Sequence, residues 1–240
     1  SSSDRLQVIN SHIVWDSDIQ SWKGISNDAY LMLWPNNTIN ASIGFTAYAP
    51  YISDGNLATA DGAYGIVSRN ASELVFKPHN DNRIDLMYAE HSTSAAGVVQ
   101  LNFKHALGKL SIGTISNNYG ENITLTQIHL TSENYYTQGT LNLSTGTWGS
   151  FTTNTTYDVT YVSEALTALF GSLAIRDKGS LTFPKDVAYT QIPGTTLTFE
   201  YTFTTANSTT FSVSKEMTVV QGKNIFININ IGQNHEVVLE

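Results

Sequence analysis

Histidines and carboxylates are the side chains of this 240-residue chain best suited to acid–base or metal chemistry, since it contains no cysteine. The six histidines show none of the short spacings at which imidazoles share one zinc ion. No Gly-x-Ser-x-Gly turn, Walker loop or His-Glu-x-x-His motif occurs either. We therefore expect no catalytic residue, no cofactor and no metal site, and we predict that the protein is not an enzyme.

Two groups of carboxylates come closest to a known kind of site. Residues 16–18 begin like a calcium loop, but Ser21 stands where an EF-hand needs glycine and Asn27 where it needs glutamate. Asp81 and Asp85 suggest a glycosidase pair, yet residues four apart on one strand are separated by ~13 Å. Either glycosidase mechanism requires a shorter separation, so we expect neither group to be functional.

Aromatic rings on a surface bind sugars by stacking, and several aromatic residues lie where such a platform could form. The tryptophans flank predicted strands: Trp15, Trp22, Trp34 and Trp148. A large ring at the end of a sheet more commonly packs over the core, and we expect this of the tryptophans. Tyr135 and Tyr136 lie in a predicted loop, where glycan binding stays open as an alternative.

The formal net charge is −8, from 20 acidic and 12 basic residues. The basic residues are scattered singly, so we expect neither a nucleic-acid footprint nor a stripe that binds anionic lipid. Charged residues are only 13% of the chain, and Thr, Ser and Asn replace them, which suits strands with one wet face. The Asn-X-Ser/Thr sequons fit either N-glycosylation or chance in a chain of this composition.

The absence of cysteine does not determine the cellular compartment of the protein. No run approaches the ~20 apolar residues that a membrane helix needs. The first five residues are polar and do not form a signal peptide. We expect either a cytosolic protein or a mature or shortened form of an exported one, and the family resemblance given below favours the second.

Alternation of apolar and polar residues with a period of two dominates the chain, and it predicts strands with one buried face. The clearest runs are residues 197–203 and 225–231. Shorter predicted strands cover residues 6–14, 30–34, 43–47, 73–76, 84–89, 122–130, 139–143, 157–163 and 211–214. A single helix is predicted at Ser163–Phe170, with Ser163 as its N-cap.

The segment from Val99 to Ile112 changes parity. Val99 and Phe103 share one face of a strand, whereas Leu110 and Ile112 lie on the opposite face. A continuous strand cannot change faces without an irregularity, so we predict a bulge or bend near residues 106–108. Gly108 is the residue that adopts an irregular backbone at least cost.

The number of strands indicates the domain organisation. Roughly fourteen predicted strands exceed what one compact sandwich usually holds. We predict an all-β fold of two tandem antiparallel β-sandwich domains. The turn-rich residues 145–150 are the best candidate for the boundary near the middle of the chain. The predicted domains are residues 1–148 and residues 149–240.

Several segments together resemble the fimbrillin-like family of Bacteroidales. The matching motifs follow the family's order: Trp34-Pro35, IGFTAYAP at 43–50, DLMYA at 85–89, VQLNFKHALGKL at 99–110, the G-x-L and T-G-x-W elements at 139–148, and GKNI at 222–225. Together they cover about residues 22–232. At position 108 this chain has glycine where the family more commonly has serine.

The resemblance implies transthyretin-like sandwich domains of Greek-key type, export as a lipoprotein, and a cell-surface role as a fimbrial subunit or tip adhesin. It also implies that an Arg-specific protease removes the lipidated N-terminal segment, which is the only link to the outer membrane. Arg5 is the candidate processing site. Expected partners are other fimbrial subunits, and a host or bacterial surface protein or glycan. The alternative function is a glycan-binding cell-surface lipoprotein.

In such a family, a strand from a neighbouring subunit fills a groove in the acceptor. This is β-augmentation, in which the donated strand satisfies unpaired backbone groups and apolar pockets. The candidate donor is the strand-like end of the chain: Glu236, Val237, Val238, Leu239 and Glu240. The same segment could instead close its own C-terminal sheet, and both interpretations stay open.

Overall fold

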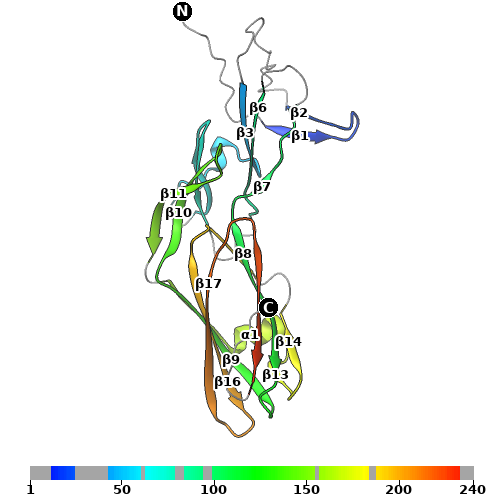
Figure 1. Cartoon of the computed structure of the whole chain (residues 1–240), viewed down its shortest axis with the longest axis vertical. Coiled ribbons are helices and arrows are strands. Elements are labelled where there is room, and N and C mark those ends of the chain that lie inside the picture. The colour runs from blue at the N-terminus through cyan, green and yellow to red at the C-terminus, as the bar shows by residue number, and fades with distance from the viewer. Residues whose placement is uncertain are drawn as a thin grey trace, which may run out of the picture.

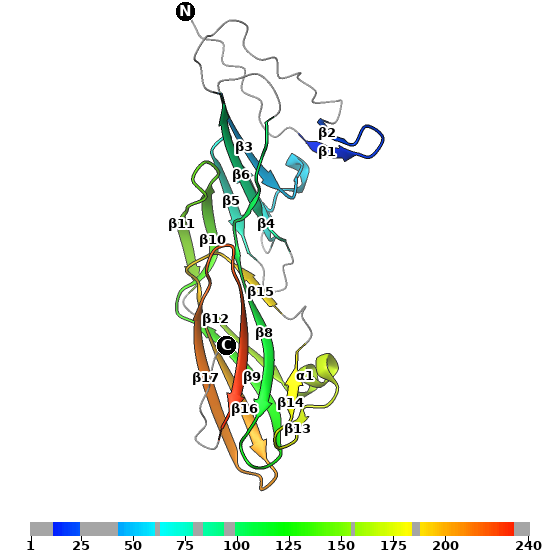
Figure 2. The same cartoon turned by 45° about the vertical axis from the view of Figure 1, so that its right-hand side comes forward.

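The computed structural model describes residues 12–24, 43–60, 63–78, 84–93, 99–154, 157–183 and 188–232. Within these ranges the chain is an elongated all-β molecule with one short α-helix (Figures 1 and 2). None of the helical segments described has the length and hydrophobicity needed to cross a bilayer. The predominance of strands among the described residues confirms the predicted all-β class.

The upper half of the molecule contains a hairpin and two small sheets. β1 (Ile13–Asp16) and β2 (Ser21–Gly24) form the hairpin. The first sheet has the order β3 (Ile43–Ala49), β6 (Met87–Thr93), β7 (Lys104–His105). The second has the order β11 (Trp148–Asn154), β10 (Tyr135–Asn142), β5 (Glu73–Lys77), β4 (Gly65–Arg69). A 3-10 turn, η1, spans Asp54–Asn56.

The lower half is a sandwich of two sheets. One has the order β12 (Tyr157–Val162), β9 (Ile123–Ser132), β16 (Thr196–Thr205), β17 (Thr210–Thr218), and β13 (Ala174–Ile175) also pairs with β9. The other is centred on β8 (Gly108–Asn117), which pairs with β14 (Ser180–Thr182), β15 (Ala188–Gln191) and β18 (Asn224–Ile231). The helix α1 (Ser163–Phe170) follows β12.

Two hydrophobic clusters form the interior. The larger lies between the two lower sheets and includes Leu110 and Phe199, and the smaller lies in the upper half and includes Phe76. β10 contributes to both, because Tyr135 belongs to the larger cluster and Leu141 to the smaller. β8 and β9 precede residue 148 but share a cluster with β16 and β18, so the domain division at 148/149 stays a prediction.

Most of the clear alternating runs form strands as predicted. Residues 197–203 lie in β16, and residues 225–231 lie in β18. One pairing differs from the expected antiparallel arrangement, because β18 runs parallel to β8 along nearly its whole length. The period of two is the same in parallel and antiparallel strands, so alternation could not reveal this. The predicted strand at 30–34 lies outside the described residues.

The predicted irregularity near residues 106–108 is confirmed. β7 ends at His105 and β8 begins at Gly108, and the two residues between them are buried. The Ala106 backbone N–H donates to the Leu86 carbonyl oxygen at 2.8 Å, while the Gly222 N–H donates to the Leu107 carbonyl oxygen at 2.9 Å. The bend therefore ties the upper sheet to the turn that precedes β18.

The helix forms where it was predicted, but its N-cap is different. Val162, in extended conformation, occupies the N-cap position, and Ser163 is the first helical residue. Gly171 ends the helix with a φ of 74°, and its backbone N–H donates to the Thr167 carbonyl oxygen. A glycine adopts this positive φ without the steric cost that a Cβ would bring.

Candidate functional site

The side of the lower sandwich between β17 and β18 has two strand edges without a described partner. β17 pairs with β16 on one edge only, and β18 pairs with β8 on one edge only. The two strands belong to different sheets and run side by side in both views (Figures 1 and 2). Unpaired strand edges are templates for a further strand, so this side is a candidate binding edge.

The exposure of inward-facing residues on β17 and β18 also supports a binding site at this edge. Leu197 and Phe199 of the central strand β16 are 0% exposed. Their cross-strand partners on β17, Met217 and Lys215, are only partly buried. Ile225, at the start of β18, is also partly buried against the larger cluster. We call Lys215, Met217 and Ile225 the sandwich mouth.

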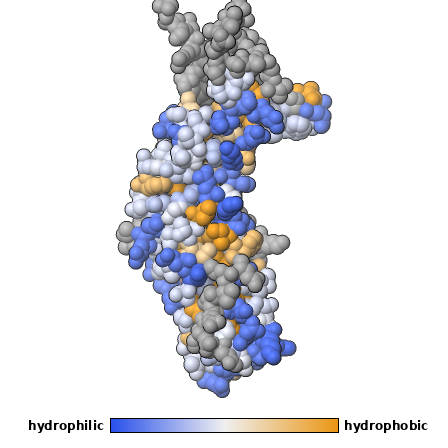
Figure 3. Space-filling view, in the orientation of Figure 1, coloured by the Kyte–Doolittle hydropathy of each residue, from blue (hydrophilic) through white to orange (hydrophobic). Residues whose placement is uncertain are grey.

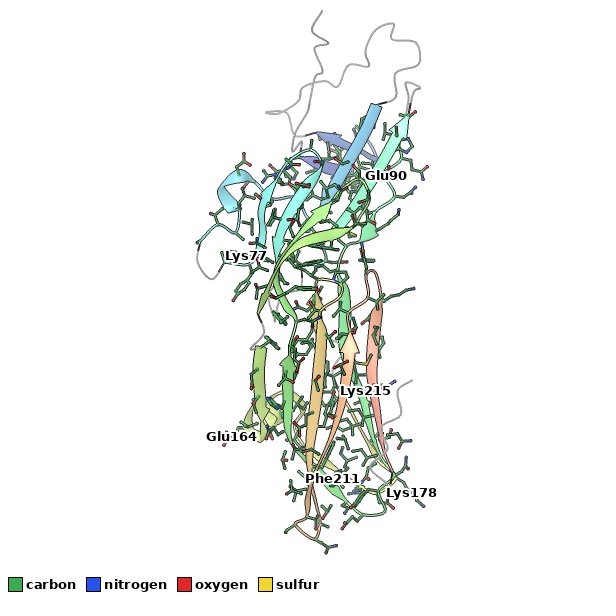
Figure 4. The ribbon with its side chains drawn as sticks, turned by 60° about the vertical axis from the view of Figure 1, so that its left-hand side comes forward. Lys77, Glu90, Glu164, Lys178, Phe211 and Lys215 are labelled. Atoms are coloured by element: carbon green, nitrogen blue, oxygen red, sulfur yellow. The ribbon has the colours of Figure 1, made fainter. Side chains whose placement is uncertain are left out.

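The opposite end of β17 is closed by aromatic packing. Phe211 stacks on Tyr119, with ring centroids 5.1 Å apart, and on Phe203, with centroids 5.5 Å apart. Figure 4 shows Phe211 toward the lower end of the strand and Lys215 higher up. An incoming strand would therefore meet apolar surface and one charge at the mouth, and a filled core at the other end.

The sequence-predicted donor and processing residues lie outside the described residues. This applies to the tail Glu236, Val237, Val238, Leu239 and Glu240, and also to Arg5. Trp34 and Asp81 lie outside them as well. Asp85 is described, and its Oδ1 lies 2.7 Å from His105 Nδ1, with both side chains about half exposed. The assignment of donor strand and processing site therefore stays a prediction.

The tyrosine pair is placed differently from the prediction. Tyr135 and Tyr136 begin β10 and do not lie in a loop. Tyr135 is buried and stacks on Tyr157 with centroids 4.1 Å apart, while Tyr136 stacks on Phe151 with centroids 4.2 Å apart. Because each ring packs against another ring of the protein, this pair does not offer a platform for a sugar.

The tryptophans divide into packed and exposed residues. Trp148 packs edge-on against Phe76, and its Nε1 donates to the Ala106 carbonyl oxygen at 2.8 Å, as expected for a ring over a core. Trp15 and Trp22 instead form a cross-strand pair on the β1–β2 hairpin and are 50% and 65% exposed. Figure 3 shows hydrophobic residues exposed on this projecting hairpin, where Ile13 and Ile19 are also open to solvent. The expectation of core packing is wrong for these two residues.

One cluster of titratable side chains crosses three strands on the outer face of the lower sandwich. His129 of β9 lies between Asp158 of β12 and Glu200 of β16. Its Nε2 is 2.9 Å from Asp158 Oδ1, and its Nδ1 is 3.6 Å from Glu200 Oε2. The hydrogen bond to Asp158, aided by both carboxylate charges and opposed by partial burial, raises the pKa of His129. Among the described residues no cluster is arranged to hold a metal ion.

This cluster predicts a small dependence of stability on pH. A raised pKa in the folded state means that protonated His129 stabilises the fold fully below its unfolded pKa of about 6.5. That contribution is lost as the pH rises through the raised folded value. We expect His129→Gln to cost about 0.5 kcal/mol at pH 5 and less at pH 8, as for exposed ion pairs. Urea unfolding at both pH values measures the difference.

Asp158→Asn is the matched variant for this prediction, since it removes the carboxylate nearest to the imidazole. It should reduce the same pH dependence without removing the histidine. A His129→Gln protein that keeps the full pH dependence of the wild type would show that the cluster does not act on stability.

These features define a class of protein: an elongated all-β structural protein whose lower sandwich has two strand edges without a described partner on one side. The family comparison matches residues 8–240 to the fimbrillin-like model, so the chain belongs to the fimbrillin-like family. This is a family of structural, non-enzymatic proteins of cell-surface fimbriae. No curated protein matches the chain.

Proposed function

We propose that this protein is a fimbrial subunit or tip adhesin that joins its neighbours by donor-strand β-augmentation. Membership of the fimbrillin-like family supports the fimbrial role. The single structural observation that carries the mechanism is the side of the lower sandwich where β17 and β18 each keep one edge without a described partner. A donated strand there would pair its backbone with an edge and place apolar side chains against the larger cluster.

The proposal includes export as a lipoprotein and maturation by an Arg-specific protease at Arg5. Removal of the segment that precedes the cut would release the protein from its outer-membrane anchor. The tail 236–240 of one subunit would then serve as the strand donated to the next. The partners are other subunits of the fimbrium, and for a tip subunit also a surface protein or glycan.

Controlled cleavage tests this assembly. Purified protein treated with an Arg-specific protease should form a ladder of oligomers, read by size-exclusion chromatography with light scattering. Arg5→Lys keeps the positive charge but resists an Arg-specific protease, and it should leave the protein monomeric. A chain shortened by residues 236–240 should be cleaved and still fail to assemble.

Each departure from this result has a distinct meaning. Correctly cleaved wild-type protein that stays monomeric would argue against a polymerising subunit and for a tip or non-assembling role. Oligomers formed equally well without residues 236–240 would show that the donor strand is another segment.

The exposed Trp15–Trp22 pair favours a second candidate function, which is binding of a glycan at the β1–β2 hairpin. The two rings meet edge to face with an interplanar angle of 70° and centroids 5.6 Å apart, and both stay largely open to solvent. A pyranose ring could stack on an open indole face. A glycan array should then give signals that Trp22→Ala abolishes, and a blank array with wild-type protein would reject this function.

A further inference from the structure

Lys215 is a charged residue on an otherwise apolar row of the edge strand β17. Its cross-strand partner is Phe199, which is fully buried in the larger cluster. Cross-strand partners share a face of the sheet, so the Lys215 side chain leaves its strand on the core side. The same row continues with Val213 and Met217, both of which contact the larger cluster.

No carboxylate pairs with the Lys215 ammonium group among the described residues. The nearby acids, Glu200 on β16 and Glu216 on β17, have the opposite parity and therefore lie on the outer face. An ammonium group at the edge of an apolar core costs free energy unless it reaches water or an opposite charge. A strand that covers the sandwich mouth would remove the water and would have to supply the opposite charge.

This placement makes the edge selective. Inward-pointing charges on edge strands oppose pairing between identical edges, because two copies of β17 would bring like charges together. The same charge favours a strand that carries an acidic side chain. Lys215 therefore disfavours edge-to-edge aggregation, while it still permits pairing of β17 with a strand that carries an acidic side chain.

We propose that Lys215 selects the incoming strand by forming an ion pair with a glutamate of the tail 236–240 of a second copy. This inference rests on the proposed strand donation. The tail has three apolar residues between Glu236 and Glu240, and a five-residue strand spans roughly 17 Å, which is about half of β17. Charge complementarity is what identifies the tail as the occupant of the sandwich mouth.

Disulfide trapping tests whether the tail occupies the sandwich mouth. Because the chain contains no cysteine, no native thiol competes with the introduced ones. One copy carries Met217→Cys at the mouth, and a second carries Val238→Cys in the tail, which lies on the same face of a strand as Glu236 and Glu240. After protease treatment and mild oxidation, a mixed dimer should form, because a disulfide requires the two Cβ atoms to lie within about 4.5 Å. Thr160→Cys on β12, at the far edge of the same sheet, is the control and should give no mixed dimer.

Charge reversal tests the role of Lys215 itself. Lys215→Glu in the acceptor copy should lower the yield of mixed dimer roughly tenfold. Glu236→Lys with Glu240→Lys in the donor copy should restore it. Lys215→Met keeps an unbranched apolar stem without the charge, and it should give an intermediate yield that no longer depends on salt.

The outcomes separate this inference from the proposed assembly. A mixed dimer whose yield is unchanged by Lys215→Glu would overturn the role of Lys215 and leave strand donation intact. Absence of the mixed dimer from protein that does oligomerise after cleavage would reject the tail as occupant. A disulfide that forms only within one chain carrying both cysteines would show that the tail closes its own sheet, which overturns the second copy as its source.

Discussion

Replacing Gly108 with alanine is expected to lower the free energy of unfolding by about 3 kcal/mol. A Cβ built on Gly108 would lie 2.9 Å from the carbonyl carbon of Val220 and closer still to its oxygen. Both are backbone atoms of the segment that leads from β17 into β18, so no rotation of a side chain relieves the clash. The change must push apart the start of β8 and the start of β18.

The contacts around Gly108 explain why such a movement is costly. The Lys109 N–H donates to the Lys223 carbonyl oxygen at 2.9 Å, and the Gly222 N–H donates to the Leu107 carbonyl oxygen at 2.9 Å. A shift of the Val220 backbone would strain both hydrogen bonds, and the Leu107 side of this contact is buried. Buried backbone groups that lose their partners carry the full cost of lost hydration.

Gly149→Ala on β11 is the matched control for Gly108→Ala. No atom lies within 4 Å of a Cβ built there, and Gly149 is not among the residues with positive φ. We expect its effect to stay within about 0.5 kcal/mol. Chemical denaturation of both variants measures the difference, and equal stabilities would show that the close approach at Gly108 is unimportant.

The strands of the lower sandwich were predictable because their sequences alternate. In β16 the apolar residues Leu197, Phe199, Tyr201 and Phe203 all face the core and are fully buried. Partner choice was not predictable in the same way. β18 pairs with β8, more than a hundred residues earlier, and local periodicity carries no information on a pairing so distant.

The misplaced tyrosines show a different limit. Tyr135 and Tyr136 are adjacent apolar residues, so they break the alternation that identifies a strand, and the prediction started β10 only at Gly139. Tyr135 stacks on Tyr157 of β12 and Tyr136 stacks on Phe151 of β11, and alternation within one segment does not reveal such partners. The His129 cluster was missed for the same reason, because its carboxylates lie 29 and 71 residues away along the chain.

Lys215 could have been found from the sequence. Phe211, Val213 and Met217 recur at alternate positions, and Lys215 occupies the one place in that row where an apolar residue is expected. A charged residue in an otherwise apolar row indicates either a strand at the edge of its sheet or a charge that pairs with a group of another chain. Only the strand order, which puts β17 at the edge of its sheet, tells that this position lies beside an unpaired edge.

Phe199→Ala should be the most destabilising of the side-chain truncations considered, at about 3–5 kcal/mol. Phe199 is fully buried, and its ring packs edge-on against Tyr189, with centroids 5.9 Å apart, across the interior of the lower sandwich. Removing it leaves a cavity between two sheets that are each held by extensive pairing, so they cannot easily collapse into the space. Thermal or urea unfolding measures the loss.

Tyr201→Phe, two residues along the same row, should have the opposite sign. The Tyr201 hydroxyl is buried and makes no hydrogen bond, so its removal avoids a desolvation cost and should stabilise the protein by about 1 kcal/mol. Burial also raises the pKa of Tyr201 far above its ordinary value. Above pH ~10 the unfolded chain ionises this tyrosine and the folded chain does not, which destabilises the wild type by about 1.4 kcal/mol for each further pH unit.

The advantage of Tyr201→Phe should therefore grow as the pH rises above 10. The two variants together separate the volume of a buried ring from the polarity of its hydroxyl, because both act on the same row of β16. A Tyr201→Phe protein less stable than the wild type at pH 7 would show that the hydroxyl has a hydrogen-bonding partner. The advantage at high pH should remain in that case, since burial disfavours the phenolate whether or not the neutral hydroxyl donates a hydrogen bond.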